Sequence, residues 1–128
     1  IPMLDGGVCD SIPVCHAQKD GYLNNVVVLI QVKGYRKPNR KFYFPKVFLH
    51  KYPKLQKQLE MRYINYNEIL DYIDELENKG HIYVLRPQKP MKVSRTTADY
   101  HLLKLLYEEG KMAGEKFLYD AGLIKVII

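Results

Sequence analysis

The chain has 128 residues, of which 47% are hydrophobic, and a formal net charge of +6. This length corresponds to one domain, and the apolar content excludes an intrinsically disordered chain. No apolar run approaches the roughly 20 residues that a membrane-spanning helix needs. The two cysteines are too few for a disulfide framework. We therefore expect reduced thiols and a cytoplasmic location, with peripheral membrane contact as an option.

The positive charge is concentrated in one segment. Nine of the 20 basic residues lie between Asp20 and Glu60, an interval without acidic residues, which leaves 11 basic against 14 acidic residues elsewhere. Tyrosines and phenylalanines are interleaved with these charges. We call Lys33 to Lys57 the basic aromatic segment. A solvated loop over packed aromatic rings is its simpler interpretation.

The alternative is that the basic aromatic segment contacts anionic lipid headgroups or phosphates. Nucleic acid is not expected as a partner, because no recognition motif matches and the rest of the chain is acidic on balance. The candidate lipid contacts are Lys33, Arg36, Lys37, Arg40 and Lys41.

The first part of the chain predicts a turn, a helix and a strand. Asp5-Gly6-Gly7 is a turn signal, and Pro13 predicts the start of a short helix with Ser11 as its cap and Gly21 as its stop. The unbroken apolar run within Asn25 to Val32 is typical of a strand buried on both faces. Such strands belong to parallel sheets with helices on either side, so the fold class is α/β.

The second part predicts a loop, two helices and a strand. The stretch from Gly34 to Pro45 is an expected loop. From Pro53 to Gly80, apolar residues recur at spacings of three and four, which predicts one long amphipathic helix. His81 to Arg86 is a second expected strand, and Asp99 caps an expected last helix. The tail Leu123 to Ile128 receives no assignment.

No complete catalytic machinery is visible. The two serines, Ser11 and Ser94, do not lie in a Gly-x-Ser-x-Gly elbow. The four histidines are scattered without zinc-ligand spacing, and no glycine-rich phosphate loop follows a strand. We therefore expect no metal ion and no cofactor.

Asp5 is the candidate for chemistry. A carboxylate directly after a parallel strand lies at the sheet edge where open α/β folds bind ligands. Gly6 and Gly7 allow the backbone to turn sharply there without covering the carboxylate. The simpler alternative is that Asp5 hydrogen-bonds its own backbone in a turn.

The surrounding sequence resembles the second signature of the patatin-like phospholipases, in which a strand ends in an Asp-Gly-Gly or Asp-Gly-Ala turn that leads to a helix-starting Pro. The matching segment is Met3-Leu4-Asp5-Gly6-Gly7-Val8-Cys9-Asp10-Ser11-Ile12-Pro13-Val14. Later motifs look like bacterial members of that family, and the resemblance extends from Ile1 to about Lys116. These motifs are Gly34-Tyr35-Arg36-Lys37, Lys51-Tyr52-Pro53, Tyr66-Asn67, Arg86-Pro87 and Lys89-Pro90-Met91-Lys92-Val93.

The resemblance implies a three-layer α/β/α fold and an acyl hydrolase with a Ser–Asp dyad that cleaves lipid esters. Asp5 matches the dyad Asp, which activates the serine directly, and Gly6 and Gly7 match the turn that presents it. In such chemistry an activated nucleophile attacks the ester carbonyl and backbone N–H groups stabilise the oxyanion.

The serine elbow and the glycine-rich oxyanion loop of that family lie upstream of the Asp turn, and neither is in this chain. The chain begins at Ile1 without an initiator Met, so we expect a C-terminal part of a longer enzyme. Residues 1–32 would end the catalytic domain and residues 33–128 would form a family-specific region. Alone, this part is expected to be inactive and to self-associate through apolar surface that truncation exposes.

Overall fold

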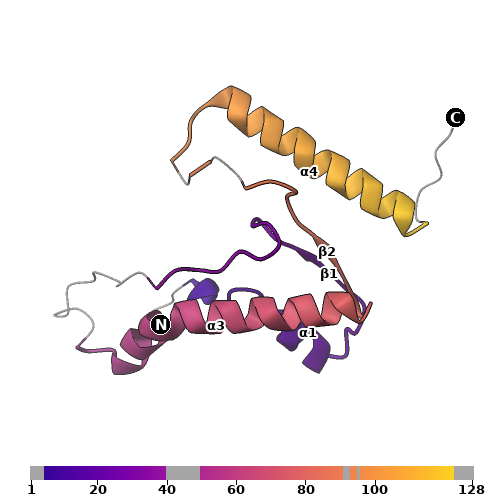
Figure 1. Cartoon of the computed structure of the whole chain (residues 1–128). Helices are drawn as coiled ribbons and strands as arrows, with labels where there is room; N and C mark the ends of the chain where they lie inside the picture. Colours follow the sequence, from indigo (N-terminus) through magenta and orange to yellow (C-terminus); the bar gives the residue numbers. More distant parts are fainter. Residues whose placement is uncertain (1–4, 40–49, 91–92, 95, 123–128) are drawn as a thin grey trace, which may run out of the picture. The chain divides into compact units, whose positions relative to one another are not determined.

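A computed structural model describes residues 5–39, 50–90, 93–94 and 96–122 (Figure 1). Strands β1 and β2 form a two-stranded parallel sheet, and helices make up most of the remaining regular structure. The expected α/β class is therefore confirmed at this level. In chain order the elements are η1 (Gly6–Val8), α1 (Val14–Lys19), β1 (Asn25–Val28), α3 (Pro53–Asn78), β2 (Ile82–Leu85) and α4 (Tyr100–Asp120).

The chain divides into two compact units. Unit 1 consists of Ile1–Asn25 and Arg36–Ile82, and therefore contains η1, α1 and α3. Unit 2 consists of Val26–Tyr35 and Tyr83–Ile128, and contains α4 with nearly all of the sheet. The candidate residues around Asp5 all lie in unit 1.

Helix α3 provides most of the core of unit 1. The sequence places Pro53 at its first turn, where the missing N–H costs nothing, and Gly80 ends it with φ +70°. Leu70, Ile73 and Leu76 are buried at spacings of three, and Ile73 is 0% exposed. The predicted amphipathic helix is confirmed.

The start of α1 differs from the expectation. Pro13 occupies the position before the first helical residue, and no side chain caps the helix. The Ser11 hydroxyl instead donates to the Gly7 carbonyl oxygen at 2.7 Å. The predicted Ser11 cap is wrong because this carbonyl lies within reach of the hydroxyl. The stop at Gly21 is confirmed by its φ of +92°.

The prediction that the first strand is buried on both faces is also wrong for the described residues. Val27 is 8% exposed, but its neighbours Val26 and Val28 are 49% and 70% exposed. Successive side chains of a strand point to opposite faces, so one face of β1 is covered and the other is open. On β2, Tyr83 is 58% exposed and Ile82 is buried. Leu29 N–H extends the pairing by donating to Leu85 O at 2.8 Å.

Helix α4 begins as expected at Asp99, whose Oδ1 accepts from the N–H groups of His101 and Leu102. The helix continues through both of its glycines, and none of its residues is buried. Phe117 packs edge-on against Tyr83 with ring centroids 5.2 Å apart. Across the described ranges, no helix is both long and apolar enough to cross a membrane.

Candidate functional site

Asp5 precedes the single turn η1 and is exposed. Its Oδ1 accepts a hydrogen bond from Gly7 N at 2.8 Å. The turn is therefore present, and Asp5 makes the hydrogen bond to its own backbone that the simpler alternative predicts. A Cβ atom at Gly7 would lie 3.2 Å from this same oxygen, whereas a Cβ at Gly6 would meet nothing within 4 Å. The turn thus needs glycine at Gly7 more than at Gly6. The strand expected before Asp5 falls on residues 1–4, outside the described part.

The turn is attached to α3 through one carbonyl. Arg62, on the third turn of that helix, donates from Nε to Gly7 O at 3.1 Å, and Ser11 donates to the same oxygen. η1 also packs against α3. The long helix therefore fixes the position of the residues that present Asp5.

A cavity of about 170 Å³ lies beside this turn within unit 1. Asp5 is not part of its wall, but Arg62 connects the wall to the turn. Polar and apolar side chains share the lining, which consists of Val8, Cys9, Asp10, Ser11, Cys15, Arg62, Asn65, Tyr66 and Ile69. The sequence did not predict this cavity, because its two sides are separated by more than 40 residues of chain.

An acid and a histidine meet near the cavity. Asp10 Oδ2 lies 2.7 Å from His16 Nδ1, in an exposed pair that bridges the loop before α1 and the helix itself. The spacing of six residues across a helix start gave no sequence signal for it. No group of three or more His, Cys, Asp or Glu side chains within the described ranges could hold a metal ion.

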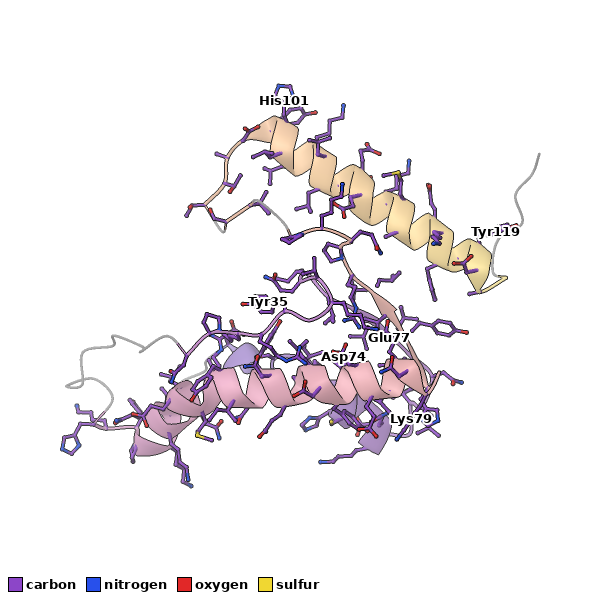
Figure 2. All side chains as sticks on the ribbon, viewed as in Figure 1. Tyr35, Asp74, Glu77, Lys79, His101 and Tyr119 are labelled. Carbon is purple, nitrogen blue, oxygen red and sulfur yellow. The ribbon has the colours of Figure 1, made fainter. Side chains whose placement is uncertain are left out.

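Two of the five candidate lipid contacts lie against α3. Arg36 forms ion pairs with Asp71 and, at 3.8 Å, with Asp74, which Figure 2 labels on this helix. Lys37 places its Nζ 4.7 Å from the centre of the Tyr66 ring. The acidic partners of Arg36 lower the charge that it can offer to an anionic ligand.

The remaining candidate contacts are less informative. Lys33 is exposed. Arg40 and Lys41 lie outside the described residues, as do the aromatic residues between 42 and 48. Other basic residues of the same segment surround the start of α3 and are exposed, namely Lys51, Lys54 and Lys57 together with Tyr52 at 52% exposure.

Comparison with known proteins identifies the longer part of the chain. Residues 52–122, more than half of its length, match the family described as Domain of unknown function (DUF6363). The chain belongs to this family. The DUF6363 region contains α3, β2 and α4, so the cavity joins family residues such as Arg62 to the preceding segment that carries Asp5.

One curated relative extends across nearly all of the chain. "Uncharacterized protein YjjU" of Escherichia coli (strain K12) is 26% identical over 130 residues, which cover 95% of this chain and 35% of that protein. The chain thus spans about a third of the length of this relative. No solved structure matches the chain.

Proposed function

We propose that the chain is the C-terminal part of a patatin-like serine acyl hydrolase that cleaves lipid esters. In this proposal Asp5 is the base of a Ser–Asp dyad, Gly6 and Gly7 form the turn that presents it, and residues preceding Ile1 supply the serine and the oxyanion loop. The observation that carries the proposal is the fixed but accessible carboxylate of Asp5.

The geometry of Asp5 suits a base. One carboxylate oxygen accepts from Gly7 N, and within the described part of the chain the other accepts no hydrogen bond. A general base needs a free oxygen within reach of the proton that it removes. The bond to Gly7, and the bonds from Arg62 and Ser11 to the Gly7 carbonyl, restrain the side chain and the turn.

The open face of the sheet supports the finer fold proposal. Val26, Val28 and Tyr83 are 49–70% exposed on a sheet with two described strands. In a three-layer α/β/α fold, further strands and a covering layer would bury such residues. In the isolated chain the same apolar face would favour self-association.

Labelling with a fluorophosphonate, which reacts with activated serines, tests the nucleophile. The product of the complete reading frame is expected to be labelled at a serine that precedes Ile1. The 128-residue chain, whose serines are Ser11 and Ser94, is expected to remain unlabelled. Labelling of Ser11 or Ser94, or no labelling of the complete product, would contradict the proposal.

Contact with anionic lipid is a second candidate function, and it is compatible with the first. Exposed lysines and a tyrosine at the start of α3 favour it, since basic and aromatic side chains suit the interface of an anionic membrane. Each lysine near such a surface contributes about 1 kcal/mol. The residues are Lys51, Tyr52, Lys54 and Lys57.

Sedimentation with vesicles of phosphatidylserine and phosphatidylcholine tests this contact. Replacing Lys51, Lys54 and Lys57 together by Ala is expected to weaken binding about 100-fold, since about 3 kcal/mol is lost. The matched control replaces three exposed lysines of α4, namely Lys104, Lys111 and Lys116. Equal effects of the two triple variants, or binding that does not weaken with added salt, would contradict a specific contact at α3.

A further inference from the structure

The cavity beside the Asp5 turn is lined by the guanidinium group of Arg62 and the side-chain amide of Asn65. Arg62 uses Nε for Gly7 O, and it has no carboxylate partner among the residues that the structure describes. Asn65 lies three residues further along α3, lines the same cavity, and makes no hydrogen bond within that part of the chain. Residues three apart on a helix share one face. Both side chains can therefore donate to the same ligand.

The charge balance of the wall favours a ligand with one negative charge. Arg62 supplies a positive charge to the wall, and Asp10, which lines the same cavity, supplies a carboxylate. This carboxylate contacts His16, which is not one of the lining residues. A doubly charged phosphate would meet one guanidinium and a nearby carboxylate, which repels it. A carboxylate group fits better, because the planar guanidinium pairs with both of its oxygens.

Part of the remaining wall is apolar. Val8, Tyr66 and Ile69 provide hydrocarbon and ring surface next to the two donors. A volume of about 170 Å³ exceeds that of several water molecules, each of which takes about 30 Å³ in the liquid. A short hydrocarbon chain attached to the carboxylate would displace this water and gain from apolar burial.

We propose that this cavity binds a short-chain carboxylate, with its head group on Arg62 and Asn65 and its carbon chain against Val8, Tyr66 and Ile69. This inference does not depend on the proposed catalytic role of Asp5, since it concerns binding within unit 1 and involves no ester cleavage. The link between the two sites is Gly7, whose carbonyl accepts from Arg62. A ligand bound to Arg62 would therefore restrain this side chain and, through it, the Gly7 carbonyl of the turn.

Titration of the ¹⁵N-labelled chain with sodium butyrate, followed by amide chemical shifts, tests the inference. The amides of cavity residues are expected to shift saturably, while sodium chloride at the same ionic strength and n-butanol leave them unchanged. Arg62→Gln is expected to weaken binding at least about tenfold, as the loss of a charge-assisted hydrogen bond predicts. The control Lys19→Gln removes an exposed cation of unit 1 that does not line the cavity, and it is expected to leave butyrate binding unchanged.

Asn65→Ala keeps the test decisive if Arg62→Gln disturbs the fold, because Asn65 makes no hydrogen bond in the described structure. Weaker binding by Asn65→Ala would support the inference. Three results would overturn it, namely the absence of saturable shifts with butyrate, unchanged binding by the Arg62 and Asn65 variants, or tighter binding of inorganic phosphate than of butyrate.

Discussion

The side-chain amide of Asn67 forms hydrogen bonds with both the backbone N–H and the backbone carbonyl of Lys37. Its side-chain oxygen accepts from Lys37 N at 2.8 Å, and its Nδ2 donates to Lys37 O at 3.1 Å. The side-chain amide thus acts as a neighbouring strand would, and it attaches the start of the basic aromatic segment to α3. An amide is well suited to this because it combines a donor and an acceptor in one plane.

Replacing Asn67 by Ala should release this attachment. The Lys37 N–H loses its acceptor, and about 1 kcal/mol is the usual net contribution of one such bond. We expect hydrogen exchange at the Lys37 amide to accelerate about fivefold to tenfold. Glu68→Ala, an exposed change at the adjacent residue of α3, is the control. Unchanged exchange at Lys37 in the Asn67 variant would show that the attachment does not hold the segment.

Ile73→Ala should destabilise the fold of unit 1. Its side chain is 0% exposed, so truncation removes buried hydrocarbon and leaves a cavity. The expected loss in the free energy of unfolding is about 2–5 kcal/mol. Met61 lies on the same helix but is 38% exposed, and Met61→Ala should cost much less. Urea unfolding of both variants measures the difference, and equal losses would contradict the assigned core.

The exposed pair Glu75 and Lys79 should make a small, pH-dependent contribution to stability. The hydrogen bond from Lys79, together with its charge, lowers the pKa of Glu75 from its ordinary 4.5, and Glu75 raises the pKa of Lys79 from its ordinary 10.5. Because the pKa of Glu75 is lowered, its ionised form stabilises the folded state at pH values above the ordinary pKa. This stabilisation is lost as the pH falls through the lowered pKa. Because the pKa of Lys79 is raised, its charged form stabilises the folded state at pH values below 10.5. This stabilisation is lost as the pH rises through the raised pKa.

Thermal unfolding of Glu75→Gln across this pH range checks the pair. The wild type should be slightly more stable than the variant near neutral pH, and the difference should disappear at strongly acidic and strongly alkaline pH. Added salt should reduce it, because both side chains are more than half exposed. A difference that is constant from acid to alkali would exclude the ion pair as its source.

The parts of this fold that the sequence predicts are those fixed by local chemistry. The spacing of apolar residues defines α3, the side chain of Asp99 defines the start of α4, and Gly80 permits the left-handed stop that ends α3. The Asp5 turn follows in the same way, because its hydrogen bond joins residues two apart. Such features depend on neighbours along the chain, so no knowledge of distant contacts is needed.

The parts that the sequence did not predict depend on distant residues. The Arg62 side chain bonds to the Gly7 carbonyl across 55 residues of chain, and Arg36 pairs with Asp71 across 35. Nothing in the local sequence around any of these residues indicates its distant partner. The exposure of Val28 could not be deduced either, since an apolar run shows that burial is favourable but not what covers it. The cavity wall has the same origin, because residues 8–15 and α3 build it jointly.

The most direct test of the proposed function is the rate at which the product of the complete reading frame cleaves a p-nitrophenyl ester. Asp5→Asn removes the proposed base with little change in shape, and Asp20→Asn, at an exposed acid after α1, is the matched control. We predict a loss of about 10²–10⁴ in kcat for Asp5→Asn, the usual contribution of a general base, and wild-type activity for Asp20→Asn. Full activity of the Asp5→Asn protein, or an equal loss in both variants, would contradict the proposed role of Asp5.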